Sequence, residues 1–130
     1  MIVVDASIVA PALVDDGATG VRFRARLAGE ELVAPELLHL EVCSVFRKLH
    51  QRGELSSRRA TAAFRDLEAL PVRRIGHQTL LPRIWQLRNN VSPYDASYVA
   101  LAEALALTLL TGDRRLGASP GHRCTIELLD

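Results

Sequence analysis

Four acidic side chains in the 130-residue chain have the type and spacing to form one site for a divalent cation: Asp5, Glu41, Asp95 and Asp113. Asp5 directly follows the apolar run 2–4, and Asp113 follows the apolar run 107–111 after one glycine. Unrelieved apolar runs of this kind predict strands that are covered on both faces of a parallel sheet. Because open α/β sheets bind ligands at the carboxyl ends of their strands, both acids are expected at that edge.

The other two acids fall in predicted helices. Glu41 lies inside the apolar stripe of its helix, three residues after Leu38 and four before Val45. A carboxylate that points toward a core is costly unless it is paired or coordinates a cation. Asp95 stands in the first turn of a later helix, on the same stripe as Val99. Both side chains are therefore expected to point inward.

Each acid also has a purely structural explanation, and the sequence leaves these open. Asp is a favoured helix N-cap, which would account for Asp5. The Gly-Asp pair that ends at Asp113 is a common turn sequence. Glu41 could form a buried salt bridge with an arginine. Ser92 and Asp95 match a capping box, a role that is compatible with a site at the same place.

Four carboxylates that meet at one edge require a counter-ion. Two unit charges ~4 Å apart repel by about 4 kcal/mol at an effective dielectric constant of ~20. Several such pairs would strain a domain whose whole stability is ~5–15 kcal/mol. A hard divalent cation removes the repulsion, and ligands that are all oxygen favour Mg²⁺ or Mn²⁺ over zinc. Such ions activate water and stabilise charge on a phosphate, so the quartet predicts metal-dependent phosphodiester chemistry.

Apolar periodicity and turn residues predict strands that alternate with helices along the whole chain. Strands are expected at 2–4, 32–34, 71–75, 107–111 and 124–128, with 71–75 at an edge. Helices are expected at 6–14, 18–27, 35–51, 57–70, 78–87 and 93–106, with Pro35 in the first turn of the third. The alternation is typical of an α/β fold. It predicts one domain, 1–130, a three-layer α/β/α sandwich around a short, mostly parallel central sheet.

Composition excludes several other classes of protein. The 16 basic and 15 acidic residues nearly cancel, so the chain lacks the overall basic field of a bulk nucleic-acid coat. All basic residues except Lys48 are arginines, a choice that suits phosphate contacts but that genome composition also produces. Cys43 and Cys124 lack metal-site spacing, which favours a reduced, cytoplasmic protein. Asp5 and Glu103 interrupt the longest apolar stretches, so neither a signal peptide nor a membrane span is expected.

Four short motifs resemble the PIN-domain family, and most closely the VapC-type toxins of prokaryotic toxin–antitoxin pairs. They are Val4-Asp5-Ala6-Ser7, Ala34-Pro35-Glu36-Leu37 followed by Glu41, Tyr94-Asp95-Ala96, and Thr111-Gly112-Asp113-Arg114-Arg115. Their order and spacing agree with the family, and the similarity extends over essentially the whole chain. The resemblance implies a metal-dependent endoribonuclease whose acidic quartet, named above, holds Mg²⁺, with Mn²⁺ as a plausible substitute.

The resemblance also implies roles for residues around the acids. Ser7 and Thr111 match hydroxyl positions near the family's site. Some members carry a further acid shortly after the last one, whereas this chain has Arg114 and Arg115 there. A second metal site is therefore left open, and the two arginines are candidates for RNA binding. The family also implies a homodimer and a cognate VapB-like antitoxin protein as partner.

Other α/β families with acids at strand ends fit the chain less well. A receiver domain needs a lysine after its last core strand, but the only lysine is Lys48, in the middle of a predicted helix. A haloacid-dehalogenase-like phosphatase needs an aspartate two residues after the first, where Ser7 stands. There is neither a phosphate-binding glycine loop nor a G-x-S-x-G elbow. The remaining alternative is a catalytically silent PIN-like module that binds RNA or protein; a missing acid would favour it, and none is missing.

Overall fold

In the computed structural model, which describes residues 1–130, five strands form one all-parallel sheet in the order β3-β2-β1-β4-β5. The strands are β1 (Ile2–Val4), β2 (Leu32–Pro35), β3 (Val72–Ile75), β4 (Leu109–Thr111) and β5 (Ile126–Leu128). Val3 of β1 lies opposite Val33 of β2 on one side and Leu109 of β4 on the other. All three side chains are fully buried, as expected for central strands covered on both faces.

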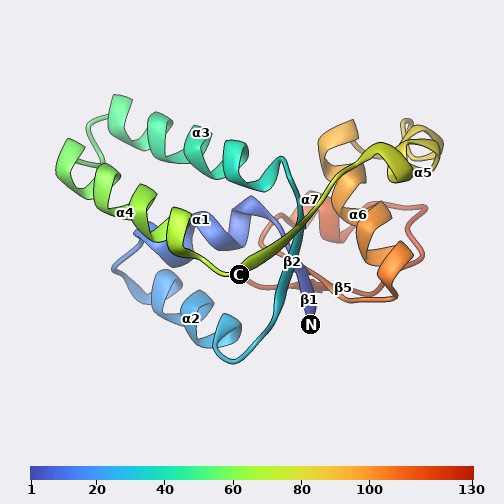
Figure 1. Cartoon of the computed structure of the whole chain (residues 1–130), viewed down its shortest axis with the longest axis horizontal. Helices are drawn as coiled ribbons and strands as arrows, with labels where there is room; N and C mark the ends of the chain where they lie inside the picture. Colours follow the sequence, from blue (N-terminus) through green and yellow to red (C-terminus); the bar gives the residue numbers. More distant parts are fainter.

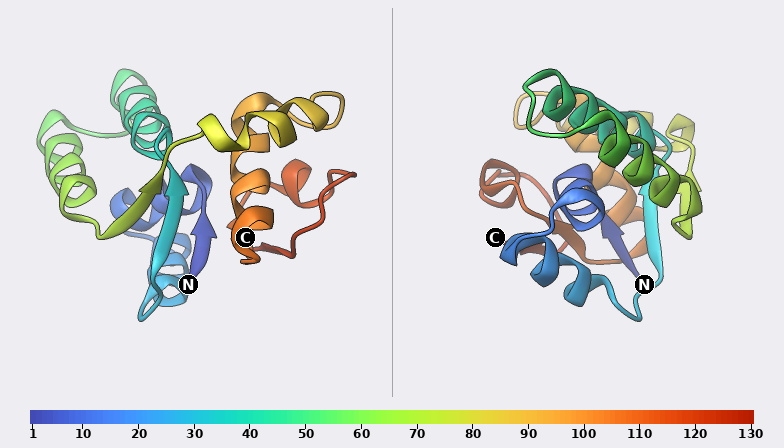
Figure 2. Two further views of the ribbon diagram at one scale, coloured as in Figure 1. Left: turned by 45° about the vertical axis from the view of Figure 1, so that its right-hand side comes forward. Right: turned by 90° about the vertical axis from the view of Figure 1, so that its left-hand side faces the viewer.

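Helices cover both faces of the sheet. They are α1 (Ala6–Val14), α2 (Ala18–Leu27), α3 (Leu38–Gln51), α4 (Ser57–Ala69), α5 (Leu81–Gln86), α6 (Pro93–Leu105) and α7 (Arg114–Gly117), with a short 3₁₀ helix, Gln78–Leu80, before α5. Figures 1 and 2 show α1 to α4 to one side of the strands and α5 and α6 to the other. The buried apolar side chains of all these layers form one continuous core. The predicted α/β/α sandwich is thus confirmed, with β3 at an edge.

The central helix of the second layer is α6. Every residue from Ala96 to Ala102 is buried, because the helix packs against β1, β2 and β4. Its sequence there is rich in alanine, whose small side chain lets a helix lie close to a sheet. Ser92 caps the helix by accepting a hydrogen bond from the Asp95 amide at 3.2 Å. The capped end fixes the position of the first turn, which carries Asp95.

Several element boundaries differ from the sequence-based expectation. Pro35 ends β2, opposite Ile75, and α3 begins only at Leu38. Proline is tolerated there because β1 pairs only with Leu32 and Val33, so Pro35 lies beyond the doubly paired part of the strand. The fourth and fifth strands are also shorter at their starts than predicted, because parallel pairing between them begins only at Leu109 and Ile126. No helix has the length and apolar content that crossing a bilayer requires.

Candidate active site

The carboxyl ends of two neighbouring strands place the first and last acids of the quartet side by side. β1 and β4 are paired. Asp5 directly follows β1, and Asp113 follows β4 after one residue. The first turn of α6 carries Asp95, and the first turn of α3 carries Glu41. All four acids are therefore delivered to the same edge of the sheet. Their roles in catalysis are taken up below as a proposal.

Asp5 is the most enclosed of the four acids, with 6% of its surface exposed. Its Oδ1 accepts hydrogen bonds from the Ser7 amide at 3.1 Å and the Ser7 hydroxyl at 2.5 Å, and its Oδ2 accepts one from the Thr111 hydroxyl at 2.6 Å. Burial raises the pKa of Asp5; these hydrogen bonds oppose the rise, and the charge of Asp95 adds to it. Asp5 is also the N-cap of α1, so the structural and functional interpretations of this residue coexist.

The two predicted hydroxyls connect Asp5 to the loop after β4. The Ser7 hydroxyl accepts a hydrogen bond from the Gly112 amide at 2.8 Å, and the Thr111 hydroxyl accepts one from the Asp113 amide at 3.1 Å. At Gly112 a Cβ atom would lie 3.3 Å from the Leu129 carbonyl and 3.4 Å from Ser7, which leaves little room for a side chain. The start of α1 and the end of β4 are thus fastened together around one carboxylate.

Glu41 is half-buried, and its Oε1 accepts a 2.6 Å hydrogen bond from the hydroxyl of Tyr98 on α6. It takes part in none of the ion pairs of the chain, so the alternative of a buried salt bridge with an arginine is not realised. Burial raises the pKa of Glu41, the Tyr98 bond opposes this, and the charges of Asp5 and Asp95 raise the pKa further. Sequence reasoning did not single out Tyr98, although its position three residues after Asp95 puts it on the same face of α6.

Asp95 and Asp113 line an open groove of about 360 Å³ together with Asn90, Val91, Ser92, Arg115 and Leu116. Burial raises the pKa of Asp95 and the charge of Asp113 raises it further, whereas the Ser92 hydroxyl and Arg115 lower it. The Asp95 carboxylate accepts no hydrogen bond from a backbone amide. Only one of the two bonds of a capping box is therefore present, the one that the Asp95 amide donates to the Ser92 hydroxyl. The side chain of Asp95 is thus available to a ligand in the groove.

Asp113 has a structural role that the sequence did not reveal. It is the N-cap of α7, and its Oδ1 accepts hydrogen bonds from the amides of Arg115 at 2.9 Å and Leu116 at 3.4 Å. The sequence analysis expects no helix after Asp113. A four-residue helix is too short to produce a periodic apolar pattern, so α7 could not be predicted that way.

The two candidate arginines after Asp113 point to different surroundings. Arg114 forms an ion pair with Asp130 at 2.9 Å, and both side chains are well exposed. Arg115 forms no ion pair, lines the groove, and is close enough to Asp95 to lower the pKa of that acid. Only Arg115 therefore presents an unpaired guanidinium beside the acids.

The donor set fits a partly hydrated Mg²⁺ or Mn²⁺. In this conformation no three Asp, Glu, His or Cys side chains form a ready-made set of ligands. However, Mg²⁺ usually keeps several waters and takes only one or two carboxylates from the protein. The charge of Asp95 raises the pKa of Asp5, the charges of Asp5 and Asp95 raise that of Glu41, and the charge of Asp113 raises that of Asp95. A cation among these acids would relieve the repulsion. Carboxylate oxygens are the donors that match this chemistry.

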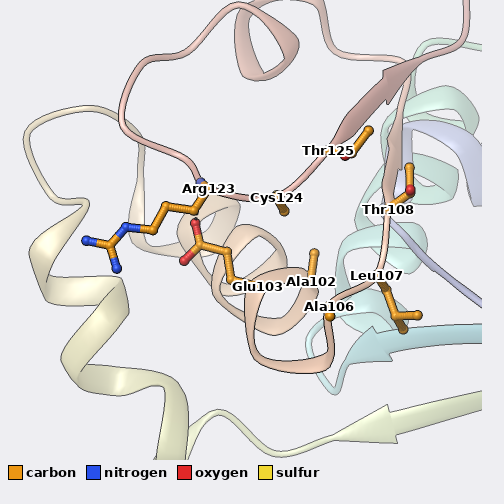
Figure 3. Close-up of a pocket in the computed structure, with 8 residues that line it drawn as sticks. All are labelled: Ala102, Glu103, Ala106, Leu107, Thr108, Arg123, Cys124 and Thr125. Carbon is orange, nitrogen blue, oxygen red and sulfur yellow. Dashed lines mark hydrogen bonds between the residues drawn. The ribbon is translucent and has the colours of Figure 1, made fainter.

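A second cleft, of about 450 Å³, lies at the opposite edge of the sheet, where Thr108 and Thr125 precede β4 and β5. In Figure 3 the Glu103 carboxylate points to the backbone of Arg123, whose guanidinium extends away from it. Glu103 accepts a 2.7 Å bond from the Arg123 amide and a bidentate pair of bonds from Arg83 at 2.7 and 3.2 Å. Its charge is already compensated, so this cleft lacks the repelling acids found at the other edge.

The raised pKa of Asp95 predicts how the metal-free protein responds to pH. The folded state raises this pKa above the ordinary value of 3.8, so it binds the proton more tightly than the unfolded chain does. Stability is therefore lost as pH rises through the raised pKa. Asp95→Asn removes this ionisation, so its advantage over wild type in urea unfolding with EDTA should grow as the pH rises above the ordinary pKa of 3.8. Asp66→Asn, which changes an exposed acid, serves as control. A stability advantage of Asp95→Asn that becomes smaller as the pH rises would contradict a raised pKa of Asp95.

Comparison with known proteins identifies the family of this chain. Residues 2–119 match the PIN domain. Ribonuclease VapC1 of Mycobacterium tuberculosis is 44% identical over 128 residues, which cover 98% of this chain and 96% of that protein. VapC ribonuclease Mb0985 of Mycobacterium bovis is 42% identical over 129 residues, 99% of this chain and 98% of that protein.

Solved structures share the fold at lower sequence identity. The crystal structure of Mycobacterium tuberculosis VapC20, a sarcin–ricin loop cleaving toxin, superposes with a TM-score of 0.70 at 19% identity, covering 95% of this chain and 97% of that one. PAE2754 from Pyrobaculum aerophilum gives a TM-score of 0.65 at 23% identity, covering 95% and 81% of the two chains. The family match and the close relatives over nearly the whole chain decide the classification: this protein belongs to the PIN-domain family and, within it, to the VapC group.

Proposed function

We propose that this protein is an endoribonuclease that hydrolyses RNA phosphodiester bonds and is the toxin of a type II toxin–antitoxin system. The observation that carries the proposal is the convergence of all four acids at the carboxyl edge of the sheet, where the charge of at least one neighbouring acid raises the pKa of Asp5, of Glu41 and of Asp95. Relatives that are 42–44% identical over nearly the whole chain carry the name ribonuclease. The alternative of a catalytically silent module is not favoured, because no acid is missing or neutralised by an arginine.

The proposed mechanism assigns the ion to Mg²⁺, with Mn²⁺ as substitute, held by Asp5, Glu41, Asp95 and Asp113. When bound, such an ion lowers the pKa of a coordinated water and stabilises negative charge on the phosphate. The chain's own contribution is to orient the acids. Ser7 and Thr111 bind both oxygens of Asp5 and hold its carboxylate in one orientation.

The proposed partners are RNA, a cognate VapB-like antitoxin and a second copy of the chain. A homodimer needs an apolar surface, and Leu81 and Trp85 of α5 are 44% and 68% exposed. Trp85→Glu should therefore convert a dimer to a monomer, with light scattering after size exclusion as the measurement.

We place the protein in the cytoplasm, consistent with two half-buried cysteines that form no disulfide.

The test of the proposed function uses RNA cleavage in cells. After induction of the wild type and of Asp5→Asn, new RNA 5′ ends are mapped and compared. Discrete ends should appear with the wild type alone. Their appearance with both proteins, or with neither, would count against hydrolysis at this site.

The two arginines give a prediction with a built-in control. Arg115 lines the groove without an ion-pair partner, so Arg115→Ala should weaken binding of a single-stranded RNA. Loss of one phosphate contact lowers the log–log salt slope by about 0.7. Arg114→Ala, which removes a neighbouring charge already paired with Asp130, should leave most of the slope intact. The measurement is fluorescence anisotropy in EDTA across a range of salt concentrations; equal slopes for wild type and Arg115→Ala would place the RNA contact elsewhere.

A further inference from the structure

The hydroxyl of Tyr98 is the one hydrogen-bond donor that the structure gives to the Glu41 carboxylate. We infer that Tyr98 is a positioning residue, which binds Oε1 of Glu41 and leaves Oε2 to bind the proposed ion. This inference rests on the proposed metal site and assigns a residue outside the acidic quartet to it. The bond measures 2.6 Å and joins residues 57 positions apart in the chain.

The geometry of Tyr98 makes it a rigid donor. It is the largest of the fully buried side chains, with 1% exposure, so its ring is fixed by the core around it. It lies one turn after Asp95 on α6, whereas Glu41 comes from α3, on the other side of the sheet (Figure 1). The hydrogen bond thus fixes a flexible acid on one helix relative to an acid on another.

The second oxygen of Glu41 is left without a partner in the protein. Oε1 accepts the Tyr98 bond, and no side chain or amide donates to Oε2. The only buried side-chain nitrogen or oxygen without a partner is His39 Nδ1, so Oε2 of Glu41 is in contact with solvent. A carboxylate held through one oxygen and open at the other is the arrangement in which an outer hydrogen bond orients a metal ligand.

A purely structural explanation would reverse the roles and make Glu41 the acceptor that a buried tyrosine needs. Phenylalanine would fill the same space without any hydrogen-bonding requirement. Glu41 moreover repels two further acids, Asp5 and Asp95, which makes it a costly choice of acceptor. The pair is therefore better explained if Tyr98 is there to orient the Glu41 carboxylate than if Glu41 is there to accept a hydrogen bond from the Tyr98 hydroxyl.

The test measures Mn²⁺ affinity, with the free ion detected by electron paramagnetic resonance and no RNA present. Tyr98→Phe should bind Mn²⁺ at least ~10-fold more weakly than wild type, the usual effect of losing an outer hydrogen bond to a ligand. Tyr94→Phe is the matched control: it removes a tyrosine hydroxyl from the same helix, but from a side chain that is 65% exposed. The control should bind Mn²⁺ like wild type.

A double-mutant cycle shows whether the effect passes through Glu41. In a Glu41→Gln background, Tyr98→Phe should cause no further loss of Mn²⁺ affinity. A further loss there, or wild-type affinity of Tyr98→Phe alone, would overturn the inference while leaving the proposed function intact. A wild type that binds no Mn²⁺ would instead overturn both. Should Tyr98→Phe fail to fold, Tyr98→Met removes the same donor with a side chain that adapts to irregular core space.

Discussion

Asp5→Asn is expected to lower RNA cleavage at least ~100-fold, the scale of a lost electrostatic contact to the transition state. The carboxylate receives three hydrogen bonds from Ser7 and Thr111 and interacts with the charges of Glu41 and Asp95. The amide keeps the shape but loses the charge. Asparagine is as good an N-cap as aspartate, so α1 should still form. Initial rates on a single-stranded RNA, with folding checked by circular dichroism, measure the effect.

The same loss is expected for Glu41→Gln and Asp95→Asn, because each also removes one charge from the group. Asp66→Asn is the matched control, since Asp66 is exposed on α4 and forms neither an ion pair nor a side-chain hydrogen bond. It should cleave RNA at the wild-type rate. A folded Asp5→Asn that retains wild-type activity would show that the cleavage chemistry does not use this edge of the sheet.

Millimolar Mn²⁺ is expected to raise the thermal midpoint of the wild type, and EDTA to abolish its cleavage of RNA. A ligand that binds only the folded state adds RT ln(1 + [L]/Kd), about 2.7 kcal/mol at a concentration of 100 Kd. Metal-free Asp95→Asn should be at least as stable as metal-free wild type, because it relieves repulsion where function costs stability. It should also lose most of the Mn²⁺ gain. Differential scanning calorimetry of the wild type and of Asp95→Asn, with EDTA and with Mn²⁺, measures these differences in stability, and the RNA cleavage assay measures the effect of EDTA on activity.

The hydrogen bonds decide which variant is the clearest probe. Asp113 caps α7 through two backbone amides, so a change at this position affects local structure as well as charge. Asp95 caps nothing with its carboxylate, and its amide contact to Ser92 survives the substitution. Asp95→Asn therefore isolates the charge. A wild type that is indifferent to Mn²⁺, together with a destabilised Asp95→Asn, would rule out the metal site and leave the acids as structural groups.

The sequence by itself determined how strands and helices follow one another along the chain, apart from α7, and the edge of the sheet at which the acids would gather. These features depend on local properties: the apolar runs before Asp5 and Asp113 are long enough only for buried strands, and parallel strands align their carboxyl ends. The N-cap at Ser92 and the inward face that carries Glu41 also follow from residues within one or two turns. For such features the signal lies in neighbouring residues, and the tertiary structure does not override it.

Tertiary structure alone decided what each acid contacts. The Tyr98–Glu41 bond spans 57 positions and the Thr111–Asp5 bond spans 106, so no local pattern encodes either contact. The difference between Arg114 and Arg115 likewise depends on where the chain terminus brings Asp130. Pro35 was assigned to a helix because its fixed φ angle suits a first turn as well as a strand end, and only the short length of β1 makes the strand possible. Local preference limits the backbone to a few choices, and long-range packing selects among them.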